Sequence, residues 1–144
     1  MSDHKYDSLK LENQICFPLY AASRKVTSKY RTVLAELDLT YTQYISMMVL
    51  WEHGELNVKE LGERLYLDSG TLTPVLKSLE QKGYVERKRS STDERVLNVT
   101  LTETGLSLRD RALSVPYEMA SCVSLSIEEA IELQRLLNKL LECM

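Results

Sequence analysis

The chain has 144 residues, of which 44% are hydrophobic and 27% charged, and its formal net charge is −3. This length fits a single domain, and the composition excludes a disordered tail protein. The longest uncharged run, Leu39 to Trp51, is shorter than the roughly 20 apolar residues that a bilayer requires. The charged N-terminus lacks an apolar signal core, so we expect a cytoplasmic protein that does not enter a membrane.

The first 40 residues predict one long helix over residues 8–37, with a proline near its start. Pro18 lacks a backbone N–H, so the helix either begins near Cys16–Phe17 or kinks there. Thr40 and Gln43 have capping-box spacing, which predicts a second helix that runs to about His53 and stops at Gly54.

The same reading predicts two shorter helices further along the chain. Asn57 and Glu60 open one that runs to about Leu65, and a tight turn follows over 66–68. The next helix ends at Gly83. Because a proline is tolerated in a first helical turn, Pro74 suggests that this helix starts at Thr71.

Between Gly83 and Thr102 the hydrophobic period changes from helical to alternating. "LNVTL" (97–101) reads as a half-buried strand, "YVERKR" (84–89) as its partner and "SSTDE" as the hairpin tip. Ser126 and Glu129 then open a final helix with a leucine stripe. The fold class is therefore mainly α with a small β-hairpin wing (α+β), a winged helix-turn-helix. In this single domain (1–144), residues 40–101 form the DNA-binding lobe, and 8–37 and 103–144 form dimerisation helices.

Charge is unevenly distributed along the chain. Residues 57–95 hold eight Lys/Arg and seven Asp/Glu, a net of +1, which leaves −4 for the rest. A local basic strip can bind DNA on an acidic body, because phosphate attraction acts over about one Debye length. A winged helix can also act as a protein–protein adaptor, and surface hairpins often carry charge.

The second helix of a helix-turn-helix lies in the major groove with its N-terminal residues at the base edges. Ser69, Thr71 and Thr73 offer short hydroxyls there, and Lys77 follows one turn on. A two-fold dimer would place two such helices roughly 34–36 Å apart on pseudo-palindromic double-stranded operator DNA.

The hairpin adds a second set of candidate DNA contacts. Arg87 and Arg89 belong to its basic strand, and Arg95 lies near its tip, with Asp93 able to hold the Arg95 guanidinium. An arginine at a wing tip suits the minor groove, where narrow A·T stretches concentrate negative potential.

Three long motifs resemble one known family. "LGERLYLDSGTLTPVLKSLEQKGYVERKRSSTDERVLNVTLTETG" is similar to the MarR family of bacterial transcriptional regulators. "LENQICFPLYAASRKVTSKYR" and "LDLTYTQYISMMVLWEH" resemble its organic-hydroperoxide-sensing repressors. The resemblance implies a homodimeric repressor that leaves DNA when an N-terminal cysteine, here Cys16, is oxidised.

The resemblance also implies roles for individual residues. Tyr30 and Tyr41 match two tyrosines that hydrogen-bond the thiolate from the other subunit, and Tyr20 lines the same region. The recognition-helix and wing motifs are matched at Ser69, Thr71, Lys77, Asp93 and Arg95. Pro18 and Ser78 depart from the pattern, standing where members usually have a helix-compatible apolar residue and, in many cases, arginine.

A lone cysteine in an apolar run is usually a small core residue. At Cys16, two physical effects favour a thiolate: the partial positive charge of a helix N-terminus, and hydroxyl donors such as tyrosine. A thiolate is the form that peroxide attacks to give sulfenic acid.

Cys122 lies where two-cysteine members of the subgroup place a resolving cysteine, which implies an intersubunit disulfide between Cys16 and Cys122. Cys143 is assigned no role. The cysteines and the histidines, His4 and His53, have no metal-type spacing, so no metal or cofactor is expected.

Three alternatives stay open. A small cellular thiol could cap Cys16 in a one-cysteine mechanism, or a small aromatic ligand could release the DNA with the cysteines as bystanders. A thiol peroxidase would use the same cysteine chemistry, but the chain has no thioredoxin-like βαβ pattern and no C-x-x-C. We therefore expect a regulator and not an enzyme.

Overall fold

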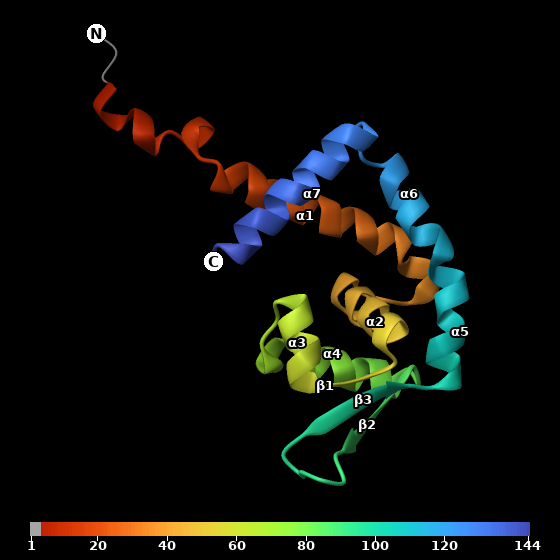
Figure 1. Ribbon diagram of the computed structural model, residues 1–144. Helices are drawn as coiled ribbons and strands as arrows, with labels where there is room; N and C mark the ends of the chain where they lie inside the picture. The colour runs from red at the N-terminus through yellow and green to blue at the C-terminus, as the bar shows by residue number, and fades with distance from the viewer. Residues whose placement is uncertain (1–3) are drawn as a thin grey trace.

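Two long helices, α1 (Cys16–Val33) and α7 (Ile127–Glu142), lie at one end of the molecule, and a helix-turn-helix lobe lies at the other (Figure 1). Helices α5 (Glu103–Arg111) and α6 (Val115–Ser121), joined by a 3₁₀ turn, connect the two ends along one side. This computed structural model describes residues 4–144. The mainly helical class with a small sheet is confirmed.

Helix α1 begins at Cys16, so one of the two readings of Pro18 is confirmed. Pro18 is the third residue of the helix, where its missing N–H would have had no helical acceptor in any case. The prediction of one helix over 8–37 was too long at both ends. Residues 4–9 and 11–13 form 3₁₀ turns, and a further 3₁₀ turn (Ala35–Leu37) ends at Asp38, which is left-handed with φ 52°.

The next two helices begin where their capping boxes predicted. In α2 (Tyr41–His53), Thr40 Oγ1 accepts from the Gln43 N–H while Gln43 Oε1 accepts from the Thr40 N–H. Asn57 and Glu60 make the equivalent pair of bonds at the start of α3 (Val58–Leu65). Helix α2 ends at Gly54, as expected.

Helix α4 (Ser69–Gln81) begins two residues earlier than predicted. Its N-cap is Asp68, whose Oδ1 accepts from the Thr71 N–H at 2.7 Å. Pro74 consequently lies inside the helix, beyond the first turn, and the Gly70 carbonyl loses its helical donor. The aspartate cap outweighed the proline as a start signal, because the N-cap bond satisfies a first-turn N–H that would otherwise be unpaired.

The sheet has three antiparallel strands in the order β1-β3-β2. β2 (Val85–Arg89) and β3 (Leu97–Leu101) are the predicted hairpin, paired from Val85↔Leu101 to Arg89↔Leu97. The third strand, β1 (Glu55–Asn57), was not predicted. It is too short to show an alternating pattern, and its last residue is also the N-cap of α3.

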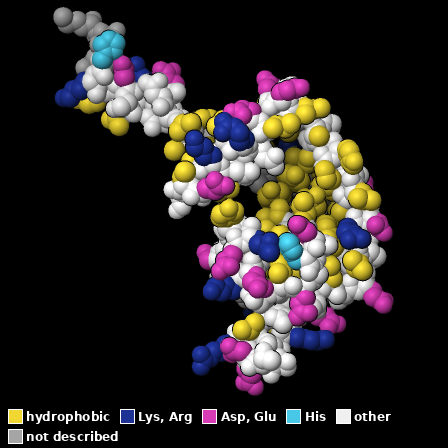
Figure 2. Space-filling model, viewed as in Figure 1, with side chains coloured by type: hydrophobic (Ala, Val, Ile, Leu, Met, Phe, Trp, Pro, Cys, Tyr) yellow, Lys and Arg dark blue, Asp and Glu magenta, His cyan; other side chains and the backbone are white. Residues whose placement is uncertain are grey.

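The core of the molecule lies in the lobe and along α5 and α6, whereas α1 and α7 contain no buried residue. On α7, Ile131 is 62% exposed and Leu136 48% exposed. Figure 2 shows hydrophobic side chains lining a hollow between the upper helices and the lobe. Apolar surface on this scale marks an interaction face. Among residues 4–144, no helix has the length and apolar character needed to cross a bilayer.

Gly105 holds α5 against the lobe by close backbone approach. Its carbonyl accepts from Trp51 Nε1 at 2.9 Å, and a Cβ at this position would meet the Tyr84 carbonyl oxygen at 1.9 Å. We expect Gly105→Ala to lower the free energy of unfolding by about 1–3 kcal/mol, because backbone must move to admit the methyl group.

Urea denaturation at fixed protein concentration measures the change. Ser107→Ala, on the exposed side of the same helix, serves as the control and should stay within about 0.5 kcal/mol of wild type. Equal midpoints for the two variants would show that this contact is not tight in solution.

Candidate redox centre and nucleic-acid interface

Cys16 is the first residue of α1 and is exposed. The backbone N–H groups of this first helical turn have no helical acceptor, so Cys16 lies at the end of α1 that carries the partial positive charge of the helix. Tyr20 lies one turn further on the same helix face, and the Arg24 guanidinium carbon sits 5.5 Å from the Tyr20 ring centre. A thiol, a phenol and a cation therefore follow one another along one face of α1.

The two tyrosines predicted to stabilise the thiolate pack against each other. The ring centres of Tyr30 and Tyr41 are 4.6 Å apart, and Tyr44 stacks behind Tyr30 at 5.9 Å. Burial, and next the neighbouring Tyr41, raises the pKa of Tyr30 above its ordinary value, so this phenol keeps its proton and can donate. Within residues 4–144 neither the Tyr30 nor the Tyr41 hydroxyl has a hydrogen-bond partner.

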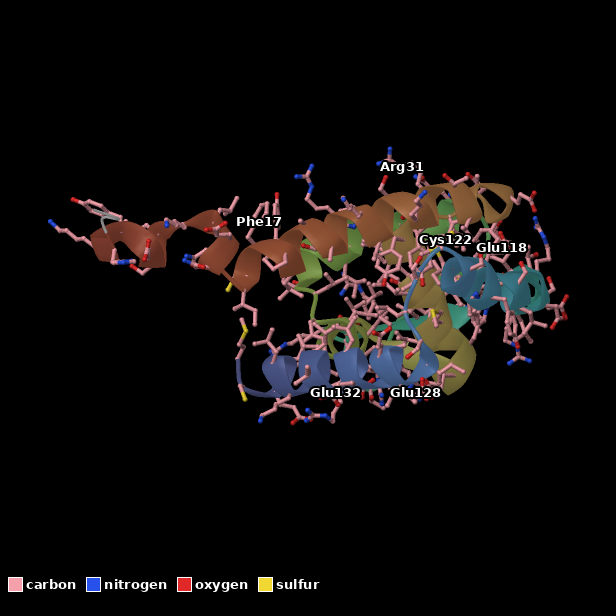
Figure 3. The ribbon with its side chains drawn as sticks, turned by 90° about the horizontal axis from the view of Figure 1, so that it is seen from above. Phe17, Arg31, Glu118, Cys122, Glu128 and Glu132 are labelled. Atoms are coloured by element: carbon pink, nitrogen blue, oxygen red, sulfur yellow. The ribbon has the colours of Figure 1, made fainter. Side chains whose placement is uncertain are left out.

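Cys16 cannot reach these tyrosines in its own chain. It lies fourteen residues before Tyr30 on the same helix, which is about 21 Å along the axis at 1.5 Å per residue. Cys122, the C-cap residue of α6, is also far from Cys16 in the same chain. Figure 3 shows Cys122 well along α1 from Phe17, which is the neighbour of Cys16. All three cysteines are free and exposed.

The predicted recognition residues all lie on α4, with Ser69, Thr71 and Thr73 in its first five residues and Lys77 one turn further on. Ser69, Thr71 and Lys77 are exposed, and Thr73 is half-buried with its hydroxyl donating to the Ser69 carbonyl at 2.6 Å. Ser69 and Thr73 line a groove of about 970 Å³ between the helices and the wing, and Arg95 lines its other side. The fold thus brings the helix and the wing to one surface.

The wing tip differs in one detail from the prediction. Asp93 Oδ1 accepts from the backbone N–H of Arg95 at 3.0 Å, so the carboxylate braces the turn and does not hold the guanidinium. The Arg95 side chain is exposed, and within the described chain it has no ion-pair partner. Arg89 donates to the Glu94 carbonyl at 2.6 Å across the hairpin.

Arg87 is held by a partner that the sequence did not reveal. Its Nε and Nη2 donate to Glu80 Oε2 at 3.0 and 2.7 Å, and its backbone N–H donates to Glu80 Oε1 at 3.1 Å. Only 18% of the Arg87 side chain is exposed. This forked contact ties β2 to the last turns of α4, so the two elements keep a fixed mutual angle.

A second unpredicted contact involves Ser78. Its hydroxyl accepts from Gln43 Nε2 at 2.9 Å, which turns it toward α2 and away from the groove. Both contacts join residues that are distant along the chain, and neither has a signal in local spacing.

The chain was compared with known proteins. A family model described as transcriptional regulator SarA/Rot matches residues 28–111. The organic hydroperoxide resistance transcriptional regulator of Bacillus subtilis (strain 168) is 48% identical over 140 residues, which cover 97% of this chain and 95% of that protein. The chain belongs to the MarR family of transcriptional regulators, in the organic hydroperoxide resistance group. These relatives are named as transcriptional regulators and not as enzymes, which confirms the expectation of a regulator.

Two solved structures of AbfR, a protein of Staphylococcus epidermidis, can be compared with the conformation of this MarR-family chain. Reduced AbfR bound to DNA is 34% identical with a TM-score of 0.83, and the match covers 96% of this chain and 95% of AbfR. Disulfide-formed AbfR is 35% identical, with 98% and 99% covered, but its TM-score is 0.63. The present conformation is therefore closer to the reduced, DNA-bound form than to the disulfide form.

The Glu80–Arg87 pair predicts a pH dependence of stability. Hydrogen bonds from Arg87 hold the pKa of Glu80 below its ordinary value of 4.5. A carboxylate with a lowered folded-state pKa stabilises the fold above its unfolded pKa, and this contribution is lost as the pH falls through the folded value. We expect Glu80→Gln to unfold at lower temperature at pH 7 and to lose less stability than wild type between pH 5 and 3.

Thermal unfolding at a series of pH values tests this expectation. Glu86→Gln is the matched control, because Glu86 and its partner Lys88 are both exposed and flank Arg87 on the same strand, β2. A wild-type pH profile for Glu80→Gln would mean that the pair does not persist in solution.

Proposed function

We propose that the protein is a homodimeric transcriptional repressor that binds operator DNA when reduced and leaves it when an organic hydroperoxide oxidises Cys16. The observation that carries the proposal is the placement of Cys16. It is exposed at the positive end of α1, while Tyr30, whose ring packs on Tyr41, lies about 21 Å further along the axis of the same helix. Only a second copy can bring the hydroxyls of these two tyrosines to the thiol.

The dimer faces follow from the same geometry. Helices α1 and α7 contain no fully buried residue in a single copy, and their exposed apolar side chains supply surface for a partner. A two-fold arrangement would place the α1 start of each copy beside the Tyr30–Tyr41 pair of the other. Because its target is chromosomal DNA, the protein acts in the cytoplasm.

The groove between α4 and the wing is the surface that meets DNA. Ser69, Thr71 and Thr73 meet the major groove from the start of α4, and Lys77 does so one turn further on. Arg95 reaches the minor groove from the wing tip, which Asp93 and Arg89 brace through the hairpin backbone. Arg87, engaged by Glu80, contributes by orienting the wing.

The sensing chemistry takes place in two balanced steps. The Cys16 thiolate attacks the distal oxygen of the hydroperoxide, so the O–O bond breaks, the alcohol leaves and the sulfur becomes a sulfenic acid. The thiol of Cys122 from the partner subunit then displaces water from this sulfur and forms an intersubunit disulfide. In the one-cysteine alternative, a small cellular thiol takes the place of Cys122.

Formation of the disulfide releases DNA because the protein then leaves the conformation that resembles reduced, DNA-bound AbfR. The contrast between the two AbfR likenesses, 0.83 for the reduced DNA-bound form and 0.63 for the disulfide form, supports a large rearrangement. Converting a mostly bound population into a mostly free one requires about 5.5 kcal/mol of differential stabilisation, which a covalent bond can supply.

The central experiment is a gel shift on double-stranded DNA from just upstream of the protein's own gene. Reduced wild type should bind, and cumene hydroperoxide should weaken its binding on the order of 100-fold. Cys16→Ser should bind equally well with and without oxidant, because it has no sulfur to oxidise.

Arg95→Ala is the control for the DNA surface: it should weaken binding while leaving the oxidant response intact. Release of Cys16→Ser by oxidant, or by a small aromatic compound, would favour the ligand-released alternative. Wild type that stays bound after Cys16 is fully oxidised would refute the proposal.

Non-reducing gel electrophoresis tests the disulfide partner. Hydroperoxide-treated wild type should run as a covalent dimer, and so should Cys143→Ser. Cys122→Ser should stay monomeric on the gel, because the sulfenic acid then has no resolving thiol. A covalent dimer of Cys122→Ser would exclude this pairing, and its loss in the Cys122→Ser, Cys143→Ser double variant would assign the bridge to Cys143.

A further inference from the structure

A polar cluster joins the start of α2 to the C-terminal half of α4. We name it the Gln43 bracket; its members are Asp38, Thr40, Gln43, Ser78 and Lys82. Gln43 Nε2 donates to Ser78 Oγ at 2.9 Å, and Gln43 Oε1 accepts from the Thr40 N–H at 3.0 Å and from Lys82 Nζ at 3.3 Å. Lys82 Nζ also bonds the Asp38 carbonyl and lies 3.2 Å from Asp38 Oδ2.

The bracket is more than a helix cap. The capping boxes of α3 and α7 are closed by their own two residues and are exposed. Gln43 is 6% exposed. Its amide oxygen accepts from the capped Thr40 N–H and from Lys82, while its amide nitrogen donates to Ser78 on α4. A buried amide with all these partners fixes the relative position of the two helices, because shifting either one would leave a polar group unpaired.

The bracket and the tyrosine pair share the first turn of α2. Tyr41 and Gln43 are two residues apart there, and the Tyr41 ring packs on Tyr30 at 4.6 Å. Any force that moves Tyr41 therefore moves Gln43 with it. At its other end the bracket holds Ser78 and Lys82, one at each side of the last turn of α4.

We infer that the Gln43 bracket is the coupling element between the redox centre and the recognition helix, with Gln43 and Ser78 as positioning residues. This inference rests on the function proposed above. Oxidation of the partner's Cys16 withdraws the contacts to Tyr30 and Tyr41, the first turn of α2 shifts, and the bracket carries that shift to α4. Because α4 spans about 19 Å, a small rotation at its C-terminal half displaces Ser69 and Thr71 at the other end.

The alternative carrier is the apolar packing between the same helices. Leu50 and Met47 of α2 and Leu72, Leu76 and Leu79 of α4 belong to one buried core. If that packing alone transmitted the shift, removing the polar link would leave the oxidant response unchanged. The bracket and the core therefore make different predictions for one small substitution.

Ser78→Ala is that substitution. It removes the α4 end of the bracket, keeps the α2 capping box and places a good helix former on α4. Fluorescence anisotropy on the operator duplex gives Kd for the reduced protein and for the protein treated with cumene hydroperoxide. Their ratio is the release factor.

For Ser78→Ala we expect a reduced-state Kd within about threefold of wild type and a release factor smaller by at least about fivefold, the lower end of typical coupling between sites. The rate of Cys16 oxidation, followed by loss of titratable thiol, should not change. A merely structural role would alter stability or basal Kd and leave the release factor as it is.

Two controls make the result specific. Ser78→Thr keeps the hydroxyl and should keep the wild-type release factor. Ser107→Ala removes a helix serine whose hydroxyl bonds only within its own helix, at Thr104 O, and should behave as wild type. A double-mutant cycle with Tyr41→Phe should be non-additive, because both residues lie on one route.

A wild-type release factor in Ser78→Ala, together with additive effects in the cycle, overturns the bracket and leaves the redox switch standing. If wild type stays bound to DNA after oxidation, the proposed function is refuted, and the coupling role of the Gln43 bracket is refuted with it. The wild-type arm therefore separates the two failures.

Discussion

The stiffness of α1 is the constraint on which the rest of this protein depends. A helix cannot fold back on itself, so the thiol at its first residue and the tyrosine near its last turn are held about 21 Å apart. Under the function proposed above, one chain therefore carries both halves of the redox centre but cannot bring them into contact. The same helix and α7 contain no fully buried residue, so in the proposed dimer one association event would both cover apolar surface and assemble the centre.

The lobe is built differently, because its parts are fixed within one chain. Among residues 4–144 of the single copy, sixteen apolar side chains are buried, most of them in the lobe and along α5 and α6. Two polar contacts then set the angles between the packed elements: Glu80 with Arg87 between α4 and the wing, and Gln43 with Ser78 between α2 and α4. Apolar packing stabilises this lobe, whereas the directional contacts specify its geometry.

The sequence predicted the features that depend on neighbouring residues. The capping boxes at Thr40, Asn57 and Ser126 each place donor and acceptor three residues apart, and all three helices begin there. The start of α4 was inferred from Pro74 alone, whereas the Asp68 cap places it two residues earlier. β1 was missed because three residues cannot display a strand period.

The contacts that orient the elements could not be predicted from spacing. Gln43 and Ser78 are 35 residues apart, and nothing near either one marks the other. The candidate residues on α4 and at the wing were found because their positions follow from motif order, yet whether a side chain faces outward depends on such distant partners. Arg87 and Arg89 read alike in the basic strip, but only Arg87 has a carboxylate from another element against it.

The forked grip of Glu80 on Arg87 has a consequence for how such a protein changes its target over evolutionary time. Because this ion pair holds the wing against α4, the proposed DNA-binding mode has a fixed distance between the major-groove and minor-groove contacts, which every half-site must match. New binding preferences are thus most accessible through exchange of the few outward side chains on α4. Half-sites with a different distance between these two contacts could be bound only after substitutions that change the Glu80–Arg87 pair.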